Sequence, residues 1–138
     1  MTLGLPERIE AKISPEPNSG CWLWTAQTIW GGYGRVRWKK RKMLAHVACY
    51  EILVGEIPEG LELDHACRVR CCVNPEHLEP VTHRVNTLRG EGVAGKNARK
   101  THCPQGHEYT VENTQVWKTY RYCRICHAQH CRNYRNKK

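Results

Sequence analysis

One short segment, residues 63–86 (LDHACRVRCCVNPEHLEPVTHRVN), concentrates side chains that bind metal ions or transfer protons. Thiolates and imidazoles are the ligands that structural zinc prefers, whereas carboxylate and amide oxygens suit magnesium. We therefore expect two kinds of site in this segment, one that holds a structural ion and one that performs chemistry on a substrate. The side chains concerned are Asp64, His65, Cys67, Cys71, Cys72, His77, His83 and Asn86.

The first predicted site is a structural zinc ion whose ligands come mostly from this segment. A CxxxxC pair is followed five residues later by a histidine, and the fourth ligand has to come from another segment. A cysteine before WLW is the best candidate, because these large apolar neighbours would anchor it in the core. We leave out Cys71, since adjacent residues seldom point at one ion, and expect Cys49 to pack in the core. The predicted ligands are Cys21, Cys67, Cys72 and His77.

The polar residues left over predict the second site. Asp64 and Asn86 offer the oxygen ligands that magnesium prefers. His65 has the type of side chain whose ordinary pKa allows base chemistry near neutral pH. A strand, a zinc-bound loop and a helix would bring these residues together in a cleft. His83 lies on the same helix face as Asn86 and is a competing ligand.

A second structural zinc site is predicted near the C-terminus. CPQGH and CRIC form two knuckles separated by a hairpin-like segment, and the set of three thiolates and one imidazole fills all four positions of a tetrahedral ion. Cys131 is the alternative ligand, and free thiols without metal are the alternative state. The predicted ligands are Cys103, His107, Cys123 and Cys126.

The composition of the chain also favours metal binding. The 138 residues include nine cysteines, eight histidines and no phenylalanine, so a large apolar core is not expected and metal ions would take over part of its role. No secretory signal is evident, and no apolar run approaches the ~18 residues of a membrane span. We expect an intracellular protein, in the host cytoplasm or associated with the nucleoid, that is neither secreted nor membrane-bound.

The charge distribution points to a nucleic acid as the partner, with a solvated basic surface as the alternative. The net charge is +9, and residues 91–138 carry ten basic but only three acidic side chains. A second basic patch, RVRWKKRK, spans residues 35–42 and can enter the major groove as a β-ribbon. For Trp30 and Trp38, packing is favoured over DNA contact. The predicted nucleic-acid contacts are Arg35, Arg37, Lys39, Lys40, Arg41 and Arg84.

Hydrophobic periodicity and turn residues divide the chain into a domain at 1–90, a linker at 91–100 and a basic zinc-knuckle tail at 101–138. In the first domain we expect a β-hairpin made of residues 21–26 and 32–38 and followed by a basic loop. The other expected elements are helices over 5–13 and 42–55, a strand at 61–63, a constrained loop at 73–80 and a helix from the N-cap Thr82 to about Gly90.

The central segment resembles the HNH nucleases, in the His-Cys box branch and its free-standing phage-type relatives. The resemblance lies in LDHAC (63–67), CVNPEHL (72–78) and THRVN (82–86), with support from GCWLW (20–24) and AHVACYEILVGEIPEG (45–60). It covers about residues 20–90. Many HNH enzymes have histidine where this chain has Asn86, and the tail looks like the zinc-knuckle tail of some phage HNH proteins.

The resemblance implies an α+β fold with a small zinc-stabilised ββα-metal core, a zinc-ribbon-like C-terminal module, and hydrolysis of DNA. His65 would be the general base, and Asn86 and Asp64 would hold the catalytic magnesium, for which manganese would substitute. Asn74 would be the middle residue of the motif, pinning the loop that orients His65. The two cysteine–histidine sets would hold structural zinc.

Three hypotheses follow for the function. The first is a metal-dependent DNA endonuclease of homing, packaging or nicking type, for which cleavage of both strands of a near-palindromic site would favour a homodimer. The second is a zinc-stabilised nucleic-acid-binding protein without catalysis, which would not need the set of Asp64, His65 and Asn86. The third is an adaptor whose C-terminal zinc ribbon binds another protein.

Overall fold

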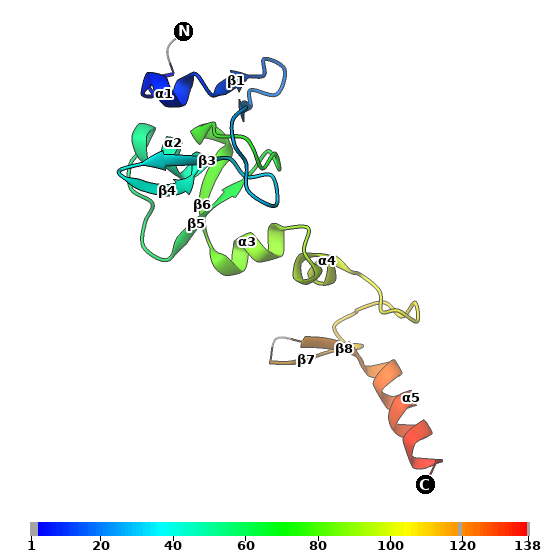
Figure 1. Ribbon diagram of the computed structural model, residues 1–138. Coiled ribbons are helices and arrows are strands. Elements are labelled where there is room, and N and C mark those ends of the chain that lie inside the picture. Colours follow the sequence, from blue (N-terminus) through cyan, green and yellow to red (C-terminus); the bar gives the residue numbers. More distant parts are fainter. Residues whose placement is uncertain (1–2, 119, 138) are drawn as a thin grey trace. The chain divides into compact units, whose positions relative to one another are not determined.

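The computed structural model describes residues 3–118 and 120–137. The chain forms two compact units, and the boundary along the sequence lies between Arg89 and Gly90. Both units mix short helices with two-stranded antiparallel ribbons (Figure 1), so the predicted α+β class is confirmed. Each unit is described separately below.

The first unit contains three antiparallel ribbons, β1–β2, β3–β4 and β5–β6, and three α-helices. Each ribbon is too small to form a core alone, and helix α2 packs on a core to which the ribbons β1–β2 and β3–β4 contribute. The elements are α1 (Glu7–Glu10), β1 (Ile13–Pro15), β2 (Trp22–Trp24), β3 (Arg35–Trp38), β4 (Arg41–Leu44), α2 (Ala45–Leu53), β5 (Leu61–His65), the 3-10 helix η1 (Pro75–His77), β6 (Leu78–Thr82) and α3 (His83–Arg89).

The strand pairing predicted for residues 21–38 is wrong. Strand β2 pairs with β1, and β3 pairs with β4 across a turn at Lys39 and Lys40. Both turn residues have positive φ, of 47° and 62°, as the type I′ turn of a two-residue hairpin requires. Consequently α2 begins at Ala45, and the residues just before it extend the basic patch as a strand.

Strands β5 and β6 and helix α3 form a ββα unit within the first unit. Strands β5 and β6 are antiparallel, with Asp64 opposite Glu79 and His65 opposite Leu78, and α3 follows β6 directly. The Val85 amide donates to the Thr82 hydroxyl at 3.3 Å, so the predicted N-cap of this helix is confirmed.

The core between α2 and β3 depends on one close approach of the backbone. Gly34 is buried, and a Cβ atom placed on it would lie 2.6 Å from the Trp24 ring and 2.9 Å from the Cβ of Ala45. The Gly34 carbonyl also accepts a hydrogen bond from the Ala45 amide at 2.8 Å. Only glycine therefore lets β3 lie this close to both residues.

We expect Gly34→Ala to lower the free energy of unfolding by about 1–3 kcal/mol, the typical cost of forcing atoms into a packed core. Urea denaturation of the zinc-loaded protein measures this cost. Gly32→Ala is the comparison, because nothing lies within 4 Å of a Cβ there and only the positive φ of 84° is penalised. Equal losses in the two variants would show that the close approach at Gly34 is not important.

The second unit consists of two knuckles around a small ribbon. Its elements are α4 (Val93–Arg99), β7 (Thr114–Trp117), β8 (Tyr120–Cys123) and α5 (Arg124–Arg135). Helix α4 occupies most of the segment predicted as a linker, where glycines suggested irregular structure. Buried side chains are few in this unit, with Cys103 and Cys123 the most enclosed of those described. Such a unit lacks the apolar area to fold without another source of stability.

Candidate functional site

His65 ends strand β5 and lies buried beneath the surface of the ββα unit, with 6% of its area exposed. Its Nε2 atom is 3.0 Å from the carbonyl oxygen of Cys72. Because a carbonyl can only accept, Nε2 carries the proton in this contact, and the neutral ring has its lone pair on Nδ1. The loop carbonyl thus selects the tautomer of His65.

Two further rings pack around His65. The His46 ring of α2 lies 4.7 Å from it, edge to face, and the Tyr33 ring lies 5.9 Å away. Burial lowers the pKa of His65 below its usual value, although the Cys72 carbonyl and the nearby Asp64 carboxylate oppose this shift. His65 is therefore neutral at physiological pH, the state that a general base requires.

His46 predicts how stability depends on pH. Burial, with a smaller effect from His65, lowers the pKa of His46 to about 3. The folded state therefore keeps this ring neutral while the unfolded chain protonates it near its ordinary value of 6.5, so its contribution to stability is present above pH 6.5 and is lost as the pH falls. Urea denaturation at pH 7.5 and 5.5 should show wild type losing more stability than His46→Leu, by up to about 1.4 kcal/mol per pH unit. Parallel losses would contradict this account.

Asp64 is buried beside two guanidinium groups. Its Oδ1 accepts from Arg68 at 2.6 Å and its Oδ2 from Arg89 of α3 at 3.5 Å, and Arg89 also pairs with Glu79. Since these arginines are partly exposed while the carboxylate is almost wholly enclosed, they supply the charge that compensates its burial.

Asn86 meets a carboxylate that the sequence analysis overlooked. Its amide nitrogen donates to Oε2 of Glu62 at 2.9 Å, and Nδ1 of His83 lies 2.9 Å from Oε1 of the same residue. These two contacts lower the pKa of Glu62. Glu62 precedes Asp64 by two positions on β5, and the alternation of side chains along a strand, which places both on one face, was the signal that could have identified it.

The side chains of Asp64 and Asn86 carry oxygen atoms that can bind a divalent cation. The Asn86 nitrogen faces Glu62, which leaves the amide oxygen as a ligand. The Asp64 carboxylate has about four lone-pair sites, so its two arginine contacts leave room for a cation. Carboxylate and amide oxygens are the donor chemistry that magnesium prefers. His65 is adjacent to Asp64 in the chain and is the last residue of β5.

The structure brings together the four residues predicted as the first zinc site (Cys21, Cys67, Cys72 and His77), whose ligand atoms all lie within 4.8 Å of one another. Nδ1 of His77 is 3.5 Å from one thiol and 3.6 Å from another. Zinc bonds of about 2.1–2.3 Å in a tetrahedron place neighbouring ligand atoms about 3.5–3.8 Å apart, so this geometry fits zinc. Cys71 lies outside the cluster, and Cys49 is fully buried in the core as predicted.

Asn74 ties this cluster to the strands around it. Its side-chain nitrogen donates to the Gly20 carbonyl at 2.8 Å, and its oxygen accepts from the Glu76 amide at 3.0 Å, which caps η1. Gly20 immediately precedes Cys21, so Asn74 fixes the distance between the two segments that supply thiols. Asn74 is 4% exposed and belongs to the same loop as Cys72, whose carbonyl orients His65.

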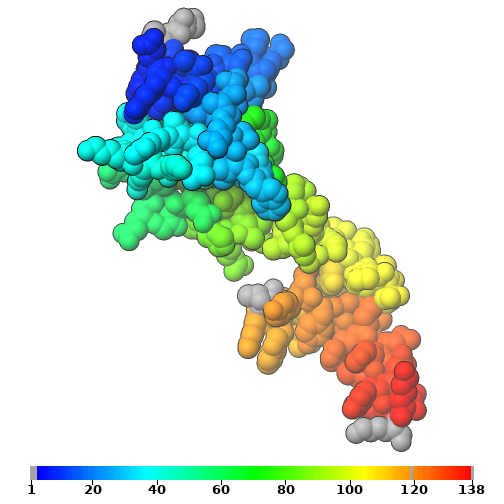
Figure 2. Space-filling view, in the orientation of Figure 1, coloured from blue at the N-terminus to red at the C-terminus, as the bar shows by residue number. Residues whose placement is uncertain are grey.

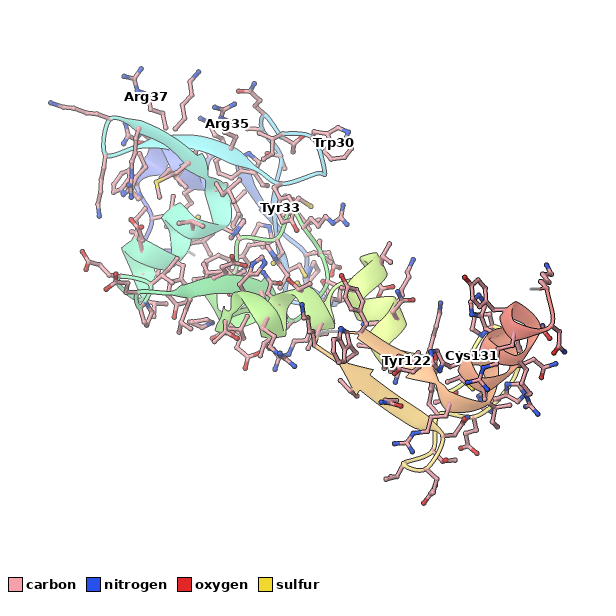
Figure 3. The ribbon with its side chains drawn as sticks, turned by 90° about the horizontal axis from the view of Figure 1, so that it is seen from below. Trp30, Tyr33, Arg35, Arg37, Tyr122 and Cys131 are labelled. Carbon is pink, nitrogen blue, oxygen red and sulfur yellow. The ribbon has the colours of Figure 1, made fainter. Side chains whose placement is uncertain are left out.

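The second predicted cluster also forms (Cys103, His107, Cys123 and Cys126), again with all ligand atoms within 4.8 Å. Nδ1 of His107 lies 3.5 Å and 3.2 Å from two of its thiols. The overlooked Asn113 supports it by accepting from the Ile125 amide at 3.2 Å and donating to the Glu108 carbonyl at 2.7 Å. Cys131, the alternative ligand, lies on α5 beside His127 instead (Figure 3).

The basic hairpin β3–β4 divides its cations into two groups. Lys39 and Arg41 pair with Glu51 of α2 at 3.4 and 3.6 Å. On the opposite face, Arg35 and Arg37 are exposed, and Lys42 lies directly across the ribbon from Arg37. Like charges placed opposite each other destabilise a ribbon unless an anion neutralises them. The remaining predicted DNA contacts, Lys40 in the turn and Arg84 on α3, are also exposed.

The two tryptophans differ in their environment. Trp38 packs partly buried against the core, as predicted, with the Arg8 guanidinium 5.2 Å above its ring. The prediction that Trp30 packs is wrong, since this residue lies on the loop between β2 and β3 and is 100% exposed. That loop covers a prominent part of the visible face of the first unit, light blue in Figure 2.

The central segment of the chain matches a known protein family. Residues 43–88 match the HNH endonuclease family model. This matched HNH segment extends from β4 through α2 and the ββα unit to α3, and it includes His65, Asn74 and Asn86. The resemblance predicted from the sequence is thereby confirmed for the central segment.

Two phage proteins are similar to the chain. Protein 2.8 of Escherichia phage T7 is 33% identical over 83 residues, which cover 60% of this chain and 57% of that protein. The uncharacterized gene 5.3 protein of Enterobacteria phage T3 is 35% identical over 51 residues, which cover 37% of this chain and 50% of that protein. The chain thus spans only half to three fifths of these relatives, whose similarity supports the phage type of the HNH segment.

No solved structure gives a significant match to the chain. Among the described residues, no helix combines the length and the apolar character needed to cross a membrane.

Proposed function

We propose that the protein is a metal-dependent DNA endonuclease that uses His65 as its general base. The observation that carries this proposal is the 3.0 Å contact between Nε2 of His65 and the Cys72 carbonyl, within a ββα unit of an HNH segment. This contact leaves Nδ1 unprotonated, so the ring can accept a proton from the water that attacks the phosphorus atom.

Asp64 and Asn86 are the proposed magnesium ligands, and manganese would substitute. A magnesium ion bound there would neutralise charge on the scissile phosphate and on the leaving 3′ oxygen. Glu62 fixes the amide of Asn86 by accepting from its nitrogen, so that the oxygen is presented for binding. Arg68 and Arg89 hold the Asp64 carboxylate in place.

The two cysteine–histidine clusters are proposed to hold structural zinc ions. Each has four protein ligands, which leaves no open position for a substrate. The first cluster, together with Asn74, fixes the loop that presents the Cys72 carbonyl to His65. The chemistry thus depends on zinc only through the position of that loop. Because free thiolates are required, the protein would act in a reducing compartment such as the interior of a host cell.

Duplex DNA is the proposed substrate, bound in part by the exposed face of the β3–β4 hairpin. Arg35, Arg37 and Lys42 share this face, and the repulsion between the latter two is relieved when a phosphate lies between them. Arg84 on α3 and the basic second unit are further candidate DNA contacts. Lys39 and Arg41 are weaker candidates, because both are already paired with Glu51.

Asn86→Ala tests the magnesium assignment. We expect the variant to need at least about tenfold more magnesium for half-maximal cleavage, because an amide ligand is removed while His65 is untouched. The measurement is the rate of plasmid nicking over a magnesium titration. Thr87→Ala, which changes an exposed neighbour on the same helix, is the matched control. An unchanged magnesium requirement in Asn86→Ala would remove this residue from the metal site.

A further inference from the structure

Trp30 is an exposed aromatic residue that nothing in the first unit covers in the described part of the chain. Its relative exposure is 100%, and Figure 3 shows its side chain directed away from the body of the unit, beyond Arg35 on β3. An indole is large and mostly apolar, so leaving it in water forgoes the favourable burial that such a side chain normally gains. An indole joins a large apolar face to a polar N–H group and is enriched at binding surfaces, so Trp30 is a candidate contact for a partner.

The loop that carries Trp30 is held in place by hydrogen bonds. The Ile29 amide donates to the Tyr33 carbonyl at 2.9 Å, and the Gly32 amide donates to the Ile29 carbonyl at 3.0 Å. Arg70, from the loop between β5 and β6, donates to the Gly31 carbonyl at 3.1 Å. The backbone on both sides of the indole is therefore fixed, which lowers the entropy that binding would cost.

The same loop reaches the proposed general base. Tyr33 closes the loop, and its ring lies 5.9 Å from the His65 ring. The Arg70 guanidinium lies 5.9 Å from the centre of the Tyr33 ring and so connects the loop tip with the Tyr33–His65 contact. A nucleic acid whose phosphate is presented to His65 would therefore have neighbouring bases close to this loop.

The charge around Trp30 fits a nucleic acid better than a protein or a lipid tail. Residues 17–50 contain no aspartate or glutamate. Arg35 and Arg37 follow the loop on β3, and their side chains project from the same side of the unit in Figure 3. Cations that track a phosphate backbone beside an aromatic platform are the usual combination for binding unstacked bases.

We propose that Trp30 stacks on a base that has left the duplex stack next to the scissile phosphate. The substrate class would then be DNA with a locally unstacked base, such as a bulge, a junction or a single-stranded segment, while Arg35 and Arg37 bind the adjoining backbone. This inference deepens the proposed endonuclease function and rests on it for the position of the phosphate. Fully paired DNA offers the indole only groove edges, against which the ring cannot stack.

The test measures binding of the full-length, zinc-loaded protein without magnesium, so that cleavage plays no part. The probes are a duplex and the same duplex with one bulged 2-aminopurine, whose fluorescence is quenched when the base stacks. We expect wild type to bind the bulged DNA more tightly and to quench it. Trp30→Ala should lose the quenching and at least about fivefold of the affinity for the bulged DNA, the lower end of base–aromatic stacking, with affinity for the intact duplex unchanged.

Two further variants sharpen this test. Trp30→Tyr keeps an aromatic face and should retain most of the quenching, whereas Val54→Ala shortens another exposed apolar side chain of the first unit and should behave as wild type. The inference is overturned if Trp30→Ala binds and quenches as wild type does, if it weakens both DNAs equally, or if it only abolishes self-association in gel filtration, which would make a second copy the partner. Quenching without magnesium-dependent cleavage would support base stacking and contradict the nuclease. Magnesium-dependent cleavage by wild type, together with unchanged DNA binding by Trp30→Ala, would support the nuclease and contradict base stacking.

Discussion

Replacing His65 by alanine should lower the rate of DNA cleavage about 10²–10⁴-fold, the range that a positioned general base contributes. The ring is enclosed by His46, Tyr33 and the Cys72 carbonyl, so no neighbouring imidazole can take over its role without moving. His46 is the nearest, but its pKa of about 3 makes it a poor base and α2 holds it in the core. The effect should appear in the chemical step.

Single-turnover cleavage with protein in excess over a labelled DNA measures that step, provided that zinc content is first shown to equal that of wild type. His83→Ala is the matched control, since His83 is an exposed histidine of α3 that contacts Glu62. We expect this variant to retain cleavage within about tenfold of wild type, because any effect passes through Glu62. If His83→Ala lost activity and His65→Ala kept it, the general base would be His83 and not His65.

Cys72→Ser should remove one of two bound zinc ions per chain and unfold the first unit. Apparent binding free energies of structural zinc are about 10–16 kcal/mol, which exceeds what this small core can supply. The thiol is buried, and in the absence of metal its pKa is raised by burial to about 12, so the free site would hold an uncharged thiol without its ion. Loss of the Cys72 ligand therefore affects folding, and not catalysis alone.

Zinc content by mass spectrometry and the near-ultraviolet circular dichroism of the tryptophans measure the two effects. Cys71→Ser is a stringent control, because it changes the adjacent cysteine, which lies outside the cluster and packs partly buried against the core. We expect it to keep both ions and the wild-type spectrum. A Cys72→Ser protein that still binds two zinc ions per chain would show that the cluster is assembled from other thiols.

The ligand sets could be predicted from the sequence because zinc restricts which residues combine. CxxC and CxxxH knuckles have the spacing of two ligands on one turn, and Cys21 was identified because WLW had to anchor its strand. The structure places these side chains together, and Trp24 is buried on β2, the strand that follows Cys21. Helix α3 could be predicted equally well, since Thr82 is a good N-cap residue.

The hairpin β3–β4 was missed for a local reason. Type I′ turns usually contain Asn-Gly or Asp-Gly, and here two lysines adopt positive φ values. Consecutive lysines in a basic run give no turn signal, so the sequence predicts a basic loop and a helix from residue 42 where the structure has the turn and β4. Without this hairpin, the sequence also does not show which cations lie on which face. The strand register places Arg37 opposite Lys42, while Arg41 pairs with Glu51.

The polar contacts of the candidate active site could not be derived from spacing. Which carboxylate meets Asn86 depends on the register of β5 against β6 and on the angle at which α3 leaves Thr82. A shift of one residue along a strand moves a side chain to the other face. The sequence therefore identified Asp64 and Asn86, but it did not identify Glu62 or the arginine contacts of Asp64.

The most direct test of the account incubates zinc-loaded wild-type protein with supercoiled plasmid, with and without magnesium. The account predicts nicked or linear plasmid when magnesium is present. It predicts no cleavage after a short treatment with EDTA, under conditions in which both zinc ions are shown to remain bound. Intact plasmid after incubation with magnesium or manganese, by protein that carries both zinc ions and binds the DNA, would contradict catalysis. That result would leave a zinc-stabilised nucleic-acid-binding protein.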